Sequence, residues 1–239
     1  MDTFVSRRVI TRWLCTGMAV PLFGGGLSGA AYASDVQRVI VSDTTFYIPK
    51  TWIDEVHQSM TFELATGAAT HAASDADYVV QSIFMNLSVA RQIDFAPFNK
   101  AQLPQWLIIT AGNKEIGAED VSWQKKFLDE ALAAILRSRS PDEDGFVRVD
   151  PRQYPHAPNG YVLVGSEQYR PLGLPLVVPC NPRSAKSEDS LDRYCRIGLG
   201  WKLDVGATYD FDTRDFPKPT WATLDREVMR FMTFLATPR

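Results

Sequence analysis

Apolar and polar residues alternate along most of the chain with the two-residue period of β-strands. The longest such run spans 196–211, where apolar residues on one side oppose charged residues on the other. Further strands are predicted from alternating or short apolar runs at 37–49, 78–93, 107–110, 146–149, 161–164 and 174–178. We therefore expect a chain rich in strands.

The period changes to that of an amphipathic helix in two stretches, at about 119–138 and 220–236. Asp120 or Ser122 can cap the first helix, and Pro141 follows its end. The second begins at Thr220 and carries an apolar stripe formed by Trp221, Leu224, Val228, Phe231 and Leu235. Because helices and strands do not alternate regularly, the pattern predicts an α+β fold with a mostly antiparallel sheet and two main amphipathic helices.

Residues 1–33 have the three parts of a cleavable export signal. A basic start is followed by an uncharged stretch and an Ala-Tyr-Ala site, so cleavage is expected between Ala33 and Ser34. The pair Arg7-Arg8 resembles the bacterial twin-arginine signal, although Ile10-Thr11 replaces its usual Phe-Leu. The twin-arginine and general secretory routes both stay open, as does a retained anchor. We expect a periplasmic protein with no integral membrane span after processing.

The remaining residues, 34–239, suit a single α+β domain or two small lobes. The full chain has 28 acidic against 25 basic residues, and removal of the arginine-rich leader increases this acidic excess. No segment clusters lysine and arginine with aromatic residues. Nucleic acids and anionic membrane surfaces are therefore not expected as partners.

Loss of the leader also removes Cys15 and leaves Cys180 and Cys195. An even number of cysteines in an exported protein predicts a disulfide. Closing a loop of ~14 residues would contribute about 3 kcal/mol to stability. Two free thiols are the alternative.

The sequence contains no recognised catalytic, phosphate-binding or metal-binding motif. His57, His71 and His156 lack the spacing of metal ligands, so neither a metal nor a cofactor is predicted. Two groups of polar residues remain as candidate sites. The first is a carboxylate group suited to acid–base chemistry or calcium, or simply solvated, formed by Asp204, Asp210, Asp212 and Asp215. The second is a loop between the cysteines, a partner-binding surface or only a stapled hairpin, with Arg183, Lys186, Glu188, Asp189, Asp192 and Arg193.

Several short motifs are spread over the chain after the leader: Ile48-Pro49 followed by Trp52, Asp94-Phe95 before Pro97, the cysteine-bearing strands, Tyr209-Asp210-Phe211, and a final helix that opens with Trp221. Together they resemble exported immunity proteins of bacterial type VI secretion. The resemblance implies a periplasmic, non-enzymatic protein that binds and neutralises a cognate protein toxin. It transfers no site residues, because such proteins share no catalytic residues. The alternatives are a periplasmic hydrolase that uses the carboxylates from Asp204 to Asp215, or an envelope-associated structural protein.

Overall fold

The computed structural model describes residues 35–88, 96–112, 140–149, 161–167, 169–171, 175–182, 193–202 and 204–238. The chain divides into two compact units, Met1–Ala31 and Tyr32–Arg239, and every described residue belongs to the second. The predicted leader and its cleavage site at Ala33 and Ser34 therefore lie outside the described residues, and so does the predicted helix at 119–138.

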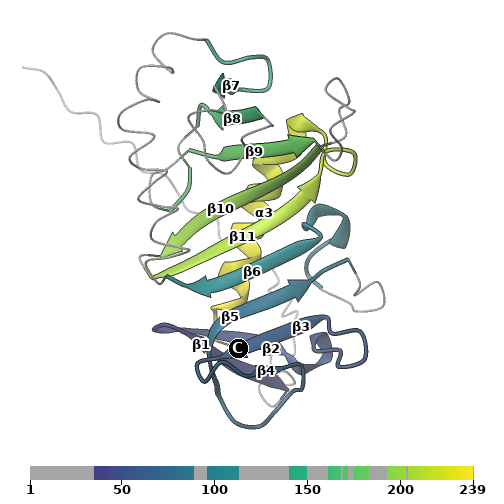
Figure 1. Cartoon of the computed structure of the whole chain (residues 1–239), viewed down its shortest axis with the longest axis vertical. Coiled ribbons are helices and arrows are strands. Elements are labelled where there is room, and N and C mark those ends of the chain that lie inside the picture. The colour runs from purple at the N-terminus through teal and green to yellow at the C-terminus, as the bar shows by residue number, and fades with distance from the viewer. Residues whose placement is uncertain are drawn as a thin grey trace, which may run out of the picture. The chain divides into compact units, whose positions relative to one another are not determined.

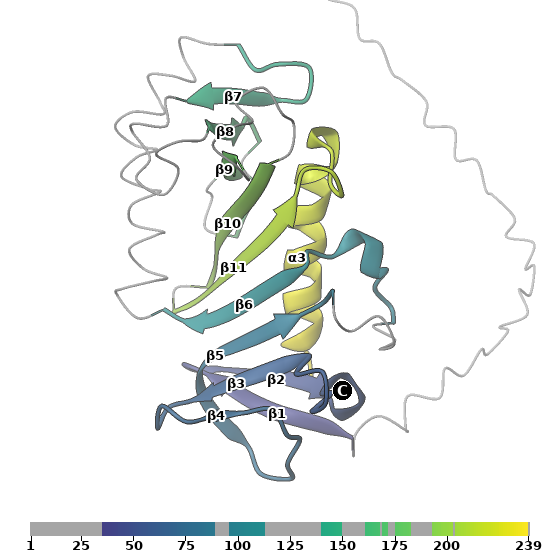
Figure 2. The same ribbon diagram turned by 45° about the vertical axis from the view of Figure 1, so that its right-hand side comes forward.

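Eleven strands form one mixed sheet in the order β2-β1-β5-β6-β11-β10-β9-β8-β7, with β3 paired to β5 and β4 paired to β3 (Figures 1 and 2). The strands are β1 (Val36–Val41), β2 (Thr44–Pro49), β3 (Met60–Leu64), β4 (Ala69–Thr70), β5 (Tyr78–Asn86), β6 (Trp106–Ala111), β7 (Phe146–Val149), β8 (Tyr161–Gly165), β9 (Val177–Pro182), β10 (Arg193–Lys202) and β11 (Val205–Asp212). Their pairing is antiparallel except between β1 and β5, which run parallel. In the part of the chain that the structure describes, they are accompanied by the short 3-10 helices η1 (Lys50–Trp52), η2 (Lys100–Gln102) and η5 (Lys218–Thr220).

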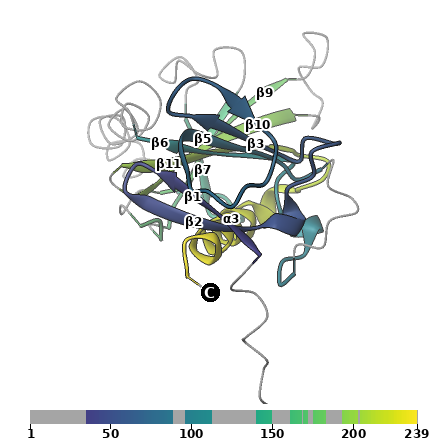
Figure 3. The ribbon, with the colours of Figure 1, turned by 90° about the horizontal axis from the view of Figure 1, so that it is seen from below.

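The helix α3 (Trp221–Leu235) lies on one face of the sheet, as Figures 1 and 3 show. Its predicted apolar stripe is buried, with each of the five side chains at most 2% exposed. Toward its C-terminus, Trp52 stacks on Phe231 with ring centroids 5.7 Å apart. Phe98 meets the same ring edge-on at 5.0 Å. The helix therefore joins the N-terminal strands to the C-terminal hairpin through one aromatic core.

The predicted α+β fold with two main amphipathic helices is wrong. The described chain is dominated by a large mixed sheet, and α3 is its single α-helix. The helix at the end of the chain lies where its stripe predicted, but the sheet extends over eleven strands and contains a parallel pair that local alternation does not reveal.

Two predicted strands are in fact hairpins. The run at 37–49 turns at Ser42, whose φ of 55° lies in the left-handed region, and continues as β2. The run at 196–211 turns between Lys202 and Val205. A register shift between Gly200 and Lys202 keeps odd-numbered residues on the helix face in both strands, so the alternation passes through the turn unbroken.

Candidate binding site on the sheet face opposite the helix

A polar cluster lies on the sheet face opposite α3, here called the outer face. Successive residues of a strand point to opposite faces. The Tyr209 hydroxyl donates to Asp225 of α3 at 2.6 Å, so the next residue, Asp210, faces outward. In the register of the sheet, Trp106 of β6 and Arg196 of β10 flank Asp210 of β11 on either side. We call these residues, with Tyr194, the Asp210 cluster.

Asp210 accepts the hydrogen bonds that hold this cluster together. The residue is only 4% exposed. Its carboxylate accepts two hydrogen bonds from the Arg196 guanidinium, from Nε at 2.7 Å and from Nη2 at 2.9 Å. The Tyr194 hydroxyl donates a third. This bidentate geometry fixes the plane of the guanidinium, although the Arg196 side chain is 63% exposed.

The electrostatics of the cluster keep both donors protonated at neutral pH. Burial and then the hydrogen bond to Asp210 raise the pKa of Tyr194 to about 12. The hydrogen bonds to Asp210 raise the pKa of Arg196 above its already high ordinary value. The cluster therefore presents the positively charged Arg196 guanidinium to solvent, and the Asp210 carboxylate that balances its charge is buried.

Trp106 adds an apolar surface beside this charge. The residue is 40% exposed, whereas its neighbour Leu107, which points to the opposite face, is fully buried. Exposed tryptophan and arginine are the residue types most enriched at the energetic centres of protein interfaces. The arrangement is therefore suited to recognition.

The predicted disulfide is confirmed and lies beside the cluster. Cys180 of β9 and Cys195 of β10 are directly opposite in register, and their sulfurs are bonded. Cys195 separates Tyr194 from Arg196 and is fully buried on the helix face. The covalent tie thus fixes the strand that carries two members of the Asp210 cluster.

The loop predicted to bind a partner is placed only at its base. Residues 183–192 lie outside the described residues, and with them Arg183, Lys186, Glu188, Asp189 and Asp192. Arg193 begins β10 opposite Pro182, and its side chain is likewise outside the description. The two residues that flank the loop, Pro182 and Arg193, are therefore next to the pair of Asn181 and Tyr194 in register.

The four carboxylates predicted as a group do not converge. Asp204 lies in the β10–β11 turn, where the Ser42 hydroxyl donates to it at 2.7 Å and lowers its pKa. Asp212 lies at the other end of β11, about 26 Å of strand away, and receives the Arg214 guanidinium at 2.8 Å. Asp215 accepts from the Gln105 amide at 3.1 Å. Asp210 and Asp212 share the outer face, with Asp212 opposite Tyr194 in register, but Asp212 is held by Arg214 whereas Asp210 accepts from Arg196 and Tyr194.

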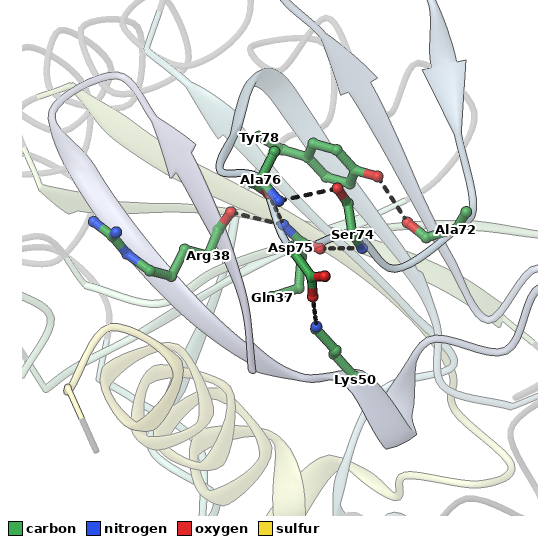
Figure 4. Close-up of polar contacts among 8 residues, drawn as sticks. All are labelled: Gln37, Arg38, Lys50, Ala72, Ser74, Asp75, Ala76 and Tyr78. Atoms are coloured by element: carbon green, nitrogen blue, oxygen red, sulfur yellow. Dashed lines mark hydrogen bonds and ion pairs between the residues drawn. The ribbon is translucent and has the colours of Figure 1, made fainter. Parts of the chain in front are cut away.

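A second polar group fixes the loop before β5, as Figure 4 shows. The Gln37 side chain is 1% exposed, accepts from the Ser74 backbone N–H at 2.6 Å and donates to the Ala76 carbonyl at 2.7 Å. Lys50 donates to Asp75 at 2.6 Å. Each bond is internal to the fold, so we assign this group a structural role.

A buried ion pair holds α3 to the helix face of the sheet. The Arg170 and Asp225 side chains, 1% and 0% exposed, meet through two hydrogen bonds of 2.9 and 2.7 Å. Arg170 also donates to the Gly198 carbonyl of β10 at 2.8 Å. Burial alone would raise the pKa of Asp225, but Arg170 and the Tyr209 hydroxyl lower it below its ordinary value. This network anchors the helix.

Sequence reasoning did not identify Trp106, Tyr194 or Arg196 as site residues. Each is a polar or aromatic residue in a strand, and their proximity depends on the register of three strands. The available signals were local: Arg196 and Asp210 occupy outward positions of one alternating run, and Trp106 directly precedes an apolar strand segment.

None of the helices in the described part of the chain is long and apolar enough to cross a membrane. In the same residues, no three His, Cys, Asp or Glu side chains form a group that could hold a metal ion. A small cavity of about 120 Å³ lies between α3 and the β7–β8 hairpin, beside Tyr169 and Arg226. The Arg226 guanidinium covers the Tyr169 ring at 4.4 Å and pairs with Glu167 at 2.6 Å.

No family model matches the sequence, and no curated protein matches it. Among solved structures, the chain is similar to the crystal structure of the Neisseria meningitidis iron-regulated outer membrane lipoprotein FrpD. The two share 8% sequence identity with a TM-score of 0.46, over 85% of this chain and 93% of that chain.

Proposed function

We propose that this protein is an exported, non-enzymatic binding protein that recognises another protein through the Asp210 cluster. The observation that carries the proposal is that an exposed Trp106 and an Arg196 guanidinium, whose orientation is fixed by a buried carboxylate, lie on either side of Asp210. The resemblance to type VI immunity proteins extends the proposal: the partner is a toxin delivered into the periplasm, and binding neutralises it.

Preorganisation is the physical reason for choosing this surface. A flexible surface arginine loses side-chain entropy when it is ordered by a partner, a cost of about 0.5–1.5 kcal/mol per side chain. The two hydrogen bonds to Asp210 have already ordered Arg196 in the free protein. The disulfide and the antiparallel neighbours hold the strand beneath it, so little rearrangement accompanies binding.

The disulfide also supports the proposed location. Disulfides persist in oxidising compartments such as the bacterial periplasm and are rare in the cytosol. Together with the predicted leader at 1–33, the bond between Cys180 and Cys195 supports a periplasmic protein whose signal is cleaved after Ala33.

A binding experiment with the protein encoded by the neighbouring gene tests the proposal. Purified mature chain is titrated calorimetrically with that protein, and growth protection is measured on co-expression in the periplasm. We expect tight binding that weakens about 30-fold in Trp106→Ala, as for a central interface residue worth about 2 kcal/mol. The matched control is Arg38→Ala, which removes an exposed arginine of β1 paired with Asp77 and is expected to change nothing. Absence of measurable affinity between the wild-type proteins would refute the proposal.

A further inference from the structure

We infer that the free edge of the Arg196 guanidinium is the anchor for a carboxylate, an Asp or Glu side chain of the partner protein. This inference rests on the proposed function and specifies the chemistry of the partner. It predicts that the partner places an acidic side chain next to an apolar one.

The geometry leaves one edge of the guanidinium available. Nε and Nη2 donate to the two oxygens of Asp210. Within the described residues, Nη1 has no hydrogen-bond partner, and it shares the opposite edge with the second N–H of Nη2. A guanidinium offers parallel N–H groups whose spacing matches a carboxylate bidentately. Asp210 holds one edge, and the 63% exposure of the Arg196 side chain leaves the other edge accessible to a partner.

The charge distribution selects an anion. Asp210 is buried, whereas the Arg196 side chain is 63% exposed, so a partner meets the positive group first. The Tyr194 hydroxyl is occupied as a donor to Asp210 and keeps its proton, which leaves no anionic phenolate to repel a carboxylate.

The neighbourhood favours a carboxylate over a phosphate. A doubly charged phosphate is usually held by several cationic or backbone donors. Here the Arg196 guanidinium stands above the buried Asp210 carboxylate, and the Arg214 guanidinium nearby is bonded to Asp212. The flanking outer-face residue on the other side of Asp210 is Trp106. Strands are about 4.8 Å apart, so Trp106 and Arg196 lie roughly 10 Å apart in backbone position. One short peptide segment can reach both.

Two matched peptides test this inference without the unidentified partner. The mature chain is titrated with acetyl-Leu-Glu-Leu-amide and with its neutral analogue acetyl-Leu-Gln-Leu-amide, and the Arg196 Nε and Trp106 indole signals are followed by NMR. We expect the acidic peptide to bind about three- to fivefold more tightly than the neutral one, the upper part of the range for an exposed charge pair. Equal binding of the two peptides by the wild-type chain would overturn the inference, and so would inorganic phosphate displacing the acidic peptide at equal concentration.

Two variants test whether the preference for the acidic peptide depends on the paired N–H groups of the Arg196 guanidinium. Arg196→Lys keeps the charge but removes the bidentate geometry, and the preference for the acidic peptide is expected to fall to less than twofold. Arg38→Lys, the same substitution at an exposed arginine of β1, is expected to retain the preference. A preference that persists in Arg196→Lys would overturn the inference.

The same variants separate this inference from the proposed function. If the toxin binds wild-type and Arg196→Lys chains equally, the binding function stands and the anchor is wrong. If the peptides are discriminated as expected but no toxin binds, the anchor stands and toxin neutralisation is wrong.

Discussion

Replacement of Asp225 by asparagine would leave the Arg170 guanidinium buried without a counter-charge. The two side chains are 0% and 1% exposed, and two hydrogen bonds join them between α3 and the segment after β8. Asparagine keeps the size of the side chain and one oxygen for the Tyr209 hydroxyl. The substitution therefore tests the charge more than the packing.

The expected cost follows from this burial. Removing one member of a buried ion pair costs about 3–5 kcal/mol, because the remaining charge stays desolvated. For a domain of this size, each kcal/mol lowers Tm by about 2–4 °C. We therefore expect Asp225→Asn to lower Tm by about 10 °C and to remove a large fraction of the free energy of unfolding.

The pH dependence has a definite sign. Because the folded-state pKa of Asp225 lies below its value in the unfolded chain, the stabilisation is complete above the unfolded pKa and is lost as pH falls through the folded one. The stability difference between wild type and Asp225→Asn should therefore be constant from neutral pH to about 5 and shrink below about 4. Urea unfolding followed by tryptophan fluorescence at several pH values measures it.

Two comparisons make the result decisive. Glu227→Gln removes the exposed pair with Arg230 on the same helix and should cost less than about 0.5 kcal/mol. The triple change Arg170→Met, Asp225→Leu and Tyr209→Phe replaces the pair by apolar side chains and also removes the hydroxyl that donates to Asp225, so it should come close to wild-type stability. A loss below about 1 kcal/mol for Asp225→Asn alone would refute this account of the helix anchor.

Three further outcomes are expected. Replacing both Cys180 and Cys195 by serine should lower the free energy of unfolding by about 3 kcal/mol and make Tm independent of reductant. A Tm equal to that of the oxidised wild-type chain would contradict this. Gly112→Ala should cost about 1–3 kcal/mol in urea unfolding, since an added Cβ would lie 3.0 Å from the Asp204 backbone, and a neutral result would disprove the tight contact. Gln37→Ala removes the hydrogen bonds to the backbone of Ser74 and Ala76, so limited proteolysis of the loop before β5 should become faster. An unchanged cleavage rate would show that these bonds do not order the loop.

The sequence identified features that depend on short-range pattern. The apolar stripe from Trp221 to Leu235 has a helical period because one face of α3 packs on the sheet. The five side chains of the stripe are buried in the structure. The pairing of Cys180 with Cys195 followed from cysteine number and compartment alone. Both signals are complete within a few tens of residues.

Features that depend on which strands pair could not be predicted in the same way. The parallel β1–β5 pair joins segments separated by β2, β3 and β4, and nothing in either strand encodes the partner. Trp106, Asp210 and Arg196 share one row only because three strands adopt one register. The turn near Lys202 was hidden because the register shift preserved the alternation on both sides of it.

The spacing of the cysteines has a consequence for the order of folding. Cys180 and Cys195 are 15 residues apart, whereas the contact between Ser42 and Asp204 closes 162 residues of chain. The chain-entropy difference between closing these two loops is about 2 kcal/mol. The sulfur–sulfur bond can therefore form within a local β9–β10 hairpin before the distant strands meet. An oxidant present early in folding would then lock this hairpin covalently before the strands that are distant in sequence pair with it.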